Sequence, residues 1–240
     1  MTRRRWIADE VSGNTAALLG EHAAHLARVL RAHVGQEFDI AAGAVVRLGT
    51  VTSVSEERVE FALGQKVAAG SSAQLTLVLS IFKFDRMEWA VEKCTEIGVA
   101  RIVPLIARRT DAHLAAAAVK RHERWMRIAR SAAEQSRRAS VPKISEPMKF
   151  KELLELSNGG WQEASRVVLA ESENKVVLRE AIDAAADEVV LAVGPEGGWT
   201  SDELRGFLNN GWASASLGPT ILRAETAAIV GAAIALDVLI

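Results

Sequence analysis

The sequence contains a single cysteine, Cys94, so no disulfide can form within the chain. This shortage favours a reducing compartment and predicts a cytoplasmic protein. Cys94 lies in a segment of helical periodicity and is interpreted as a small core residue rather than a nucleophile. No uninterrupted apolar stretch reaches the length of a transmembrane helix, and the N-terminus lacks a signal-peptide pattern, so no membrane partner is expected.

Several catalytic signatures are missing as well. Five histidines occur without metal-ligand spacing, because no cysteine or carboxylate completes a ligand set around His22 and His25. We therefore expect no metal. The sequence lacks a G-x-S-x-G motif, which argues against an α/β serine hydrolase. It also lacks G-x-G-x-x-G and a Walker lysine loop, which argues against ordinary dinucleotide and nucleoside triphosphate sites.

An excess of positive charge is missing too, because 29 Lys and Arg residues are matched by 30 Asp and Glu residues. Any nucleic-acid partner must therefore bind through local clusters. One cluster is Arg3-Arg4-Arg5, which together with Arg28 and Arg31 makes the N-terminal part basic.

A second cluster lies on one face of a helix predicted over residues 120–137. That face carries Lys120, Arg124, Arg127, Ser131, Glu134 and Arg138. It either follows a phosphate backbone or is an ordinary solvated helix surface. Glu134, in the middle of the cations, favours a more specific role.

The 240 residues are 49% hydrophobic and 25% charged, which suits one large or two small domains. Up to about residue 70 the pattern is mostly β. A helix is predicted over 21–33, with Leu18 on its apolar face. Strands are predicted at 3–8, 37–40, 45–54 and 59–63. These elements predict a small β-barrel module, followed by a linker at 68–72.

From residue 73 on, short apolar strands alternate with helices. The strands are predicted at 75–81, 101–106, 167–170, 189–193 and 213–217. A helix is predicted from Asp85, with Glu88 completing a capping box, to Gly98. Further helices are predicted at 120–137, 175–186, 200–209 and 224–240. Repeated β-α units imply an α/β domain whose mainly parallel sheet has helices on both faces.

Two loops that follow predicted strands carry the candidate chemistry. Residues 194–198, Gly-Pro-Glu-Gly-Gly, lie beyond the carboxyl end of a strand, where open parallel sheets bind ligands. A tight turn would explain these glycines equally well.

The second loop, residues 217–227, contains a Gly-Pro turn flanked by Leu217, Ile221 and Leu222. Apolar residues in a loop need a cover, which is either the interior of the domain or a flat apolar ligand such as an adenine ring. The helix start that follows suits a carboxylate or hydroxyl groups. The alternative is a buried loop closed by pairing between Arg223 and Glu225.

Together these segments resemble the trefoil-knotted SPOUT methyltransferases, and more narrowly the bacterial small-subunit rRNA uridine-N3 methyltransferases. The likeness covers nearly the whole chain, because further family motifs occur in the same order. They are Arg4-Arg5, residues 25–31, Lys83, residues 85–88, Lys93, residues 96–98, Pro104, residues 123–125, residues 132–136, Arg138 and residues 141–142.

The resemblance implies a PUA-like RNA-binding β-barrel domain over residues 1–70 and a knotted SPOUT methyltransferase domain over residues 73–240. It implies a homodimer that uses S-adenosylmethionine to methylate N3 of the uridine at position 1498 of 16S rRNA in the assembled small ribosomal subunit. The implied cofactor-binding residues are Leu169, Val193, Gly194, Pro195, Glu196, Gly197, Leu217, Gly218, Ile221, Leu222, Arg223, Thr226 and Ala227. The implied RNA-binding residues are Arg4, Arg5, Arg28, Arg31, Arg124, Arg127 and Arg138. The implied catalytic residues are Arg223, Glu225 and Glu134.

Uridine N3 is a poor nucleophile while it is protonated, so the reaction needs a base or a cation that stabilises the uridine anion. Glu134, Glu196 and Glu225 are candidate bases, and Arg223 and Arg138 are candidate anion stabilisers. The sequence leaves the choice among them open.

Three positions depart from the family pattern. Thr220 stands where arginine is usual, and Phe84 and Arg137 stand where glycine is frequent. We expect the change at Thr220 to cost a phosphate or RNA contact that the resemblance implies, and Arg137 to replace that contact in part. Two other interpretations stay open: a methyltransferase of another RNA position or of tRNA, and a non-catalytic ribosome-assembly factor that binds RNA through its basic surfaces.

Overall fold

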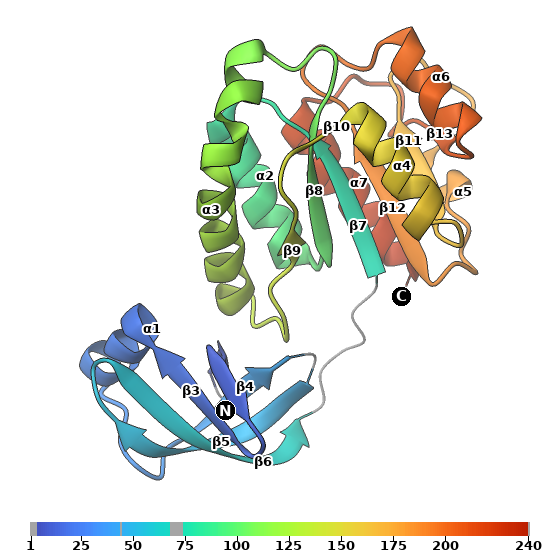
Figure 1. Ribbon diagram of the computed structural model, residues 1–240. Coiled ribbons are helices and arrows are strands. Elements are labelled where there is room, and N and C mark those ends of the chain that lie inside the picture. Colours follow the sequence, from blue (N-terminus) through green and yellow to red (C-terminus); the bar gives the residue numbers. More distant parts are fainter. Residues whose placement is uncertain (1–3, 44, 68–73, 240) are drawn as a thin grey trace. The chain divides into compact units, whose positions relative to one another are not determined.

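The computed structural model describes residues 4–43, 45–67 and 74–239 (Figure 1). The chain divides into two compact units. In the described residues, the N-terminal unit comprises the chain up to 67 together with 133–141, and the C-terminal unit comprises 74–132 and 142–239. Arg3, the predicted linker at 68–72 and Ile240 lie outside the described residues.

The N-terminal unit is built on one curled sheet. Its strand order is β1-β4-β5-β6-β3-β2, and all neighbours are antiparallel except β1 and β4. The strands are β1 (Arg5–Ile7), β2 (Glu10–Ser12), β3 (Thr15–Leu19), β4 (Glu37–Ala42), β5 (Val45–Val54) and β6 (Arg58–Val67). β1 and β2 stand at opposite ends of this order but follow each other in the chain. The sheet therefore has to close on itself, as the predicted barrel requires.

The helical segment of this unit is shorter than the periodicity suggests. It consists of α1 (Gly20–Ala24) and one π-helical turn, η1 (His25–Val29). Leu18 was expected on a helix face, but it is buried in β3. The β2–β3 hairpin was not predicted, because strands of three and five residues leave too few alternations to distinguish them from a helix entry.

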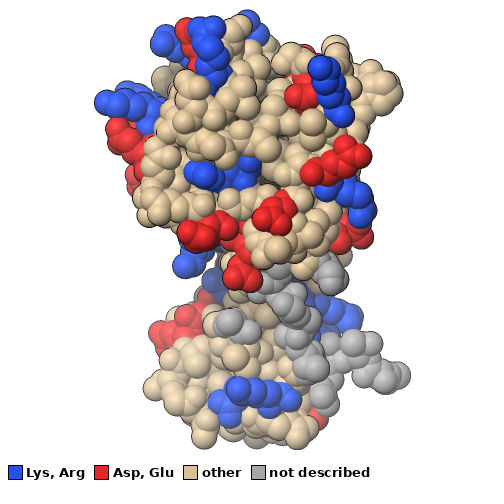
Figure 2. All heavy atoms as spheres, turned by 90° about the vertical axis from the view of Figure 1, so that its right-hand side faces the viewer, with Lys and Arg blue, Asp and Glu red and all other residues tan. Residues whose placement is uncertain are grey.

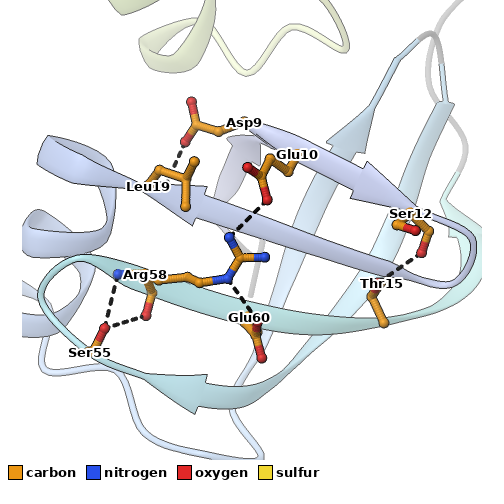
Figure 3. A network of polar contacts seen from close by, with 8 residues as sticks. All are labelled: Asp9, Glu10, Ser12, Thr15, Leu19, Ser55, Arg58 and Glu60. Atoms are coloured by element: carbon orange, nitrogen blue, oxygen red, sulfur yellow. Dashed lines mark hydrogen bonds and ion pairs between the residues drawn. The ribbon is translucent and has the colours of Figure 1, made fainter.

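A surface network joins the strands of this barrel (Figure 3). Arg58 on β6 reaches across to β2 and pairs with Glu10 at 2.8 Å, and its Nε pairs with Glu60 at 2.8 Å. Hydrogen bonds to the two carboxylates raise the pKa of the Arg58 guanidinium. This cation is therefore already neutralised, and the face does not present it freely to a phosphate.

The C-terminal unit contains a sheet in which every strand pair is parallel, as predicted. Its order is β10-β8-β7-β12-β11-β13, and β9 pairs with β8. The strands are β7 (Gln74–Ser80), β8 (Arg101–Ile106), β9 (Lys143–Ile144), β10 (Met148–Lys149), β11 (Ser165–Leu169), β12 (Glu188–Val193) and β13 (Ala213–Ala215).

Helices cover both faces of this sheet (Figure 1). They are α2 (Phe84–Ile97), α3 (Ala112–Gln135), α4 (Phe150–Gly160), α5 (Leu178–Ala181), α6 (Ser201–Asn209) and α7 (Ala224–Leu239). On one face α7 packs against β7, β12 and α2. On the other, Leu153 of α4 and Phe207 of α6 join a core cluster with Val78 and Val190 of the sheet. In the described chain, no helix is long and apolar enough to cross a membrane.

Several helix boundaries differ from prediction. α2 begins at Phe84 without a side-chain cap, and Glu88 bonds to Arg124 of α3 instead of closing a capping box. α3 ends at Gln135, so Arg138 lies beyond the helix and not on its face. The helix predicted over 175–186 shrinks to α5, and α4 was not predicted. By contrast, the capping box of Thr200 and Glu203 at α6 is confirmed.

Cys94 is fully buried in α2, and burial raises the pKa of its thiol to about 12. Because the thiolate is the reactive form, we expect no labelling of the native protein by a thiol reagent at pH 8. One equivalent should react in denaturant. Rapid labelling of the folded protein would show that α2 opens easily.

Candidate functional site

A cavity of about 590 Å³ lies at the carboxyl ends of three adjacent strands, β12, β11 and β13. Ligands of open parallel sheets bind at such an edge, because the loops that leave neighbouring strands converge there. The cavity is lined by all of the predicted cofactor-binding residues except Thr226, whose neighbour on α7, Ala227, does line it. Lining residues that were not predicted include Arg86, Arg109, Ala170, Glu171, Ser172 and Trp199.

The Gly194–Gly198 loop forms one wall of the cavity. A Cβ atom at Gly194 would lie 3.2 Å from the indole ring of Trp199, so only glycine fits there without displacing the ring. The indole Nε1 of Trp199 donates to the carbonyl of Leu169 at 2.9 Å. Arg109 donates to the carbonyl of Gly197 at 2.7 Å. These bonds fix the loop against the ends of β11 and β8.

The loop after β13 forms another part of the wall. Gly218 has φ +117°, a conformation that side-chain-bearing residues rarely adopt, and a Cβ there would meet nothing within 4 Å. Ile221 is 79% exposed, so the described chain does not cover it. Of the two alternatives that the sequence left open, the exposure of Ile221 favours a ligand over the domain interior.

An arginine and two glutamates meet beside this cavity. Arg86, near the start of α2, pairs through Nη1 with Glu196 Oε1 at 2.8 Å. Its Nε lies 3.7 Å from Oε1 of Glu225, which is only 5% exposed. The other oxygen of Glu225 is buried and has no hydrogen-bond partner among the described residues. The pairing of Glu225 with Arg223 suggested by the sequence is therefore replaced by a pairing with Arg86, and Arg223 lies exposed on the cavity wall.

Arg86 and Arg109 could have been found from the sequence with a rule already applied to the other loops. Both follow the carboxyl ends of parallel strands, β7 and β8, as the predicted loops follow β12 and β13. Arg86 also lies in a segment that carries the family likeness, but no role was predicted for it. What the sequence could not supply was the strand order that brings these ends together.

Glu134, the third candidate base, belongs to the N-terminal unit. Its Oε1 lies 3.3 Å from Nε2 of His22, and Nδ1 of that ring lies 3.5 Å from Asp9. Glu134 does not line the cavity. Its expected catalytic role stays a prediction.

The predicted RNA-binding arginines differ in whether they are paired with a carboxylate, partly buried or exposed. Arg28 pairs with Glu56, whose hydrogen bond raises the pKa of the guanidinium. Arg124 binds Glu88 through two nitrogens, with the same effect on its pKa. Arg5 lies 3.7 Å from Asp39 and donates to the carbonyl of Arg137. Burial lowers the pKa of the partly buried Arg138. The remaining three, Arg4, Arg31 and Arg127, are exposed.

Charges of both signs are mixed on the visible surface. Figure 2 shows blue and red groups interspersed over the drawn face of the C-terminal unit, without one continuous basic area. Any RNA contact on that face therefore depends on individual arginines rather than on a broad positive field. Among the described residues, no cluster of three or more His, Cys, Asp and Glu side chains is placed to hold a metal ion.

Comparisons with known proteins agree with the fold. A family model described as an RNA methyltransferase domain matches residues 70–236. The ribosomal RNA small subunit methyltransferase E of Mycobacterium bovis is 34% identical over 229 residues, which cover 91% of this chain and 85% of that protein. The protein of the same name from Synechocystis is 34% identical over 161 residues, which cover 66% of this chain and 52% of that protein.

A crystal structure of a ribosomal RNA small subunit methyltransferase E from Neisseria gonorrhoeae, bound to S-adenosyl methionine, superimposes with a TM-score of 0.82. It is 27% identical, and the match covers 96% of this chain and 95% of that one. The expected fold class, a trefoil-knotted SPOUT domain preceded by a small PUA-like β-barrel domain, is thereby confirmed. The chain belongs to the RNA methyltransferase family that the model describes, and within it to the ribosomal RNA small subunit methyltransferase E family.

Proposed function

We propose that this protein is an S-adenosylmethionine-dependent methyltransferase that modifies N3 of a uridine in 16S rRNA. The observation that carries the proposal is the cavity itself. Loops from three adjacent parallel strands converge on it, and they contain nearly all of the residues that resemble the cofactor site of the family. The solved relative from Neisseria gonorrhoeae binds S-adenosyl methionine, which supports the same cofactor here.

The residues present fit this cofactor. A Cβ at Gly218 would point into open space, so its absence leaves room beside the backbone for a polar ligand, and exposed Ile221 offers a surface for the adenine ring. When bound, S-adenosylmethionine supplies an electrophilic methyl group on a sulfonium. The walls described above would hold it by contacts with Gly194, Leu217 and Leu222.

The chain must also bring the uracil close to that methyl group and help N3 to lose its proton. Close, oriented binding contributes a large part of such an acceleration. The target base has to be turned out of any stack before it enters the cavity. Exposed Arg223 on the cavity wall is placed to contact the RNA backbone or the base.

The RNA partner proposed is 16S rRNA at position 1498 within the assembled small subunit, in the cytoplasm. The N-terminal unit would bind it as a PUA-like domain, with exposed Arg4 and Arg31 as the accessible cations. We also propose that the protein is a homodimer, and sedimentation of the purified protein would test this oligomeric state. The competing view, a non-catalytic assembly factor, predicts RNA binding without cofactor binding.

Calorimetric titration with S-adenosylhomocysteine tests the cofactor site. We expect one site per chain in the wild type and no measurable binding in Gly218→Trp, because the indole would enter the open space next to Gly218. Gly218→Ala is the matched control, since it has the same backbone strain without the bulk and should retain weakened binding. No binding by the wild type would favour the assembly factor.

Mass-spectrometric mapping of small subunits lacking the modification then tests the substrate. Incubation with the protein and S-adenosylmethionine should add one methyl group, at uridine N3. A methyl group on another nucleotide, or on tRNA alone, would contradict the proposed substrate and leave the cofactor site intact as a conclusion.

A further inference from the structure

We propose that Arg86 and Glu196 act as one catalytic pair that contacts the uracil of the target uridine. Arg86 donates to a carbonyl oxygen of the base and stabilises its negative charge, while the carboxylate of Glu196 accepts the proton of N3. Buried Glu225, which lies next to the guanidinium, holds Arg86 in position. This inference rests on the proposed function and assigns roles within the same cavity.

The pair is assembled from separate parts of the chain. Arg86 comes from α2 after β7, and Glu196 comes from the loop after β12. These two strands are neighbours in the sheet, so their carboxyl ends lie side by side. Both side chains line the cavity, about a third of each is exposed, and the Nη1–Oε1 distance is 2.8 Å. The pair therefore faces the space that a ligand would enter.

The pair is chemically complementary to uracil. A guanidinium offers five N–H donors and no acceptor, while a carboxylate only accepts. Uracil presents the opposite arrangement, because its N3–H donor lies next to a carbonyl acceptor on either side. Arg86 directs one nitrogen at Glu196 and another at Glu225, so donors remain for the base. A hydrogen-bonded Arg–Glu pair can thus meet N3–H and one carbonyl at the same time.

Glu225 gives Arg86 a fixed position. A buried carboxylate is costly without a nearby cation, and the guanidinium of Arg86 lies 3.7 Å away. Glu225 does not line the cavity, so it acts through Arg86. Of the three glutamates considered as bases, Glu196 is the one that lines the cavity in this chain.

The N3–H bond breaks, its electron pair stays on N3 of the uracil, and the proton moves to the carboxylate of Glu196. The N3 pair then forms a bond to the methyl carbon of the cofactor while the carbon–sulfur pair returns to sulfur. The products are N3-methyluridine, S-adenosylhomocysteine and one proton, which Glu196 releases to water.

Steady-state methylation of small subunits as a function of pH tests the pair. We expect Arg86→Gln to lower kcat about 100-fold, as the loss of one oxyanion donor does, with an unchanged Kd for S-adenosylhomocysteine. Its deficit should shrink as the pH rises, because solvent then removes the N3 proton more readily. Glu196→Gln should lower kcat about 100-fold or more. Arg86→Lys should recover part of the loss, because it keeps the charge but not the planar fork.

The role of Glu225 is tested by a double-mutant cycle. Glu225→Gln should lower kcat and shift the pH profile in the same direction as Arg86→Gln, but by less. The double variant should be no worse than Arg86→Gln alone, since Glu225 acts through that residue. The control is Arg205→Gln, which removes an arginine from an exposed ion pair with Asp202 on α6 and should leave kcat unchanged.

Two results would overturn the inference. A raised Kd for S-adenosylhomocysteine in Arg86→Gln, with a deficit that does not change with pH, would mean that Arg86 holds the cofactor or the loops. An unchanged kcat in Glu196→Gln would exclude it as the base. An inactive wild type would instead contradict the proposed function, so the two failures are distinguishable.

Discussion

Replacing Phe207 with alanine is expected to lower the free energy of unfolding of the C-terminal unit by about 4 kcal/mol. Phe207 is fully buried in α6 and packs edge-on against three aromatic rings. The ring centroids lie 5.0 Å away for Phe150, 5.0 Å for Trp199 and 4.8 Å for Trp212. Alanine would leave a cavity among rigid rings that cannot collapse to fill it.

Urea denaturation followed by circular dichroism measures this loss. Leu208→Ala is the matched control, because it removes a neighbouring residue of the same helix that is 51% exposed and should change stability by less than about 0.5 kcal/mol. Because Trp199 lines the cavity, Phe207→Ala should also weaken binding of S-adenosylhomocysteine. Equal losses in the two variants would mean that the aromatic cluster is not well packed.

Replacing Gly49 with alanine is expected to destabilise the N-terminal unit by about 3 kcal/mol. Gly49 lies in β5, where the register with β6 shifts, and a Cβ there would overlap Cγ1 of Ile40. Ile40 is a fully buried core residue, so it has no open space to move into. The added methyl group must therefore displace a strand.

Gly64→Ala provides the control for Gly49→Ala. Gly64 lies in the adjacent strand β6, but its Cβ would be 3.5 Å from the carbonyl of Leu48, an ordinary contact. This substitution should be neutral or slightly stabilising, because alanine loses less backbone entropy than glycine in a strand. Hydrogen exchange of peptides from residues 37–67 would locate the effect. Equal exchange in both variants would contradict the proposed overlap.

The sequence predicted the C-terminal sheet well because buried parallel strands have a recognisable sequence pattern. Continuous apolar runs such as 75–81 and 189–193 mark strands covered on both faces, and the Thr200–Glu203 box marks a helix start. Short elements give a weaker pattern in the sequence. β2 has only three residues, and α4 has a polar, glycine-containing end that gives a weak apolar period.

The sequence predicted the two loops of the site, but it did not predict the ion pair between Arg86 and Glu196. Spacing along the chain indicates which residues follow a strand, not which strands are neighbours. The contact of Arg86 with Glu196 depends on β7 lying beside β12, and these strands are separated in sequence by β8 to β11. Likewise, the pairing of Arg28 with Glu56 joins a helix to a hairpin turn, which no helical period predicts.

The division of the chain into two units also bears on how this family could exchange its parts. Residues 133–141 are counted with the N-terminal unit although they lie in the middle of the C-terminal sequence, so the backbone passes between the units three times. Arg137 and Glu134 in that stretch bond to Arg5 and His22. Recombination at the linker alone would separate these partners. The N-terminal unit is therefore not a module that can be exchanged at a single junction, because residues 133–141 would have to be exchanged with it.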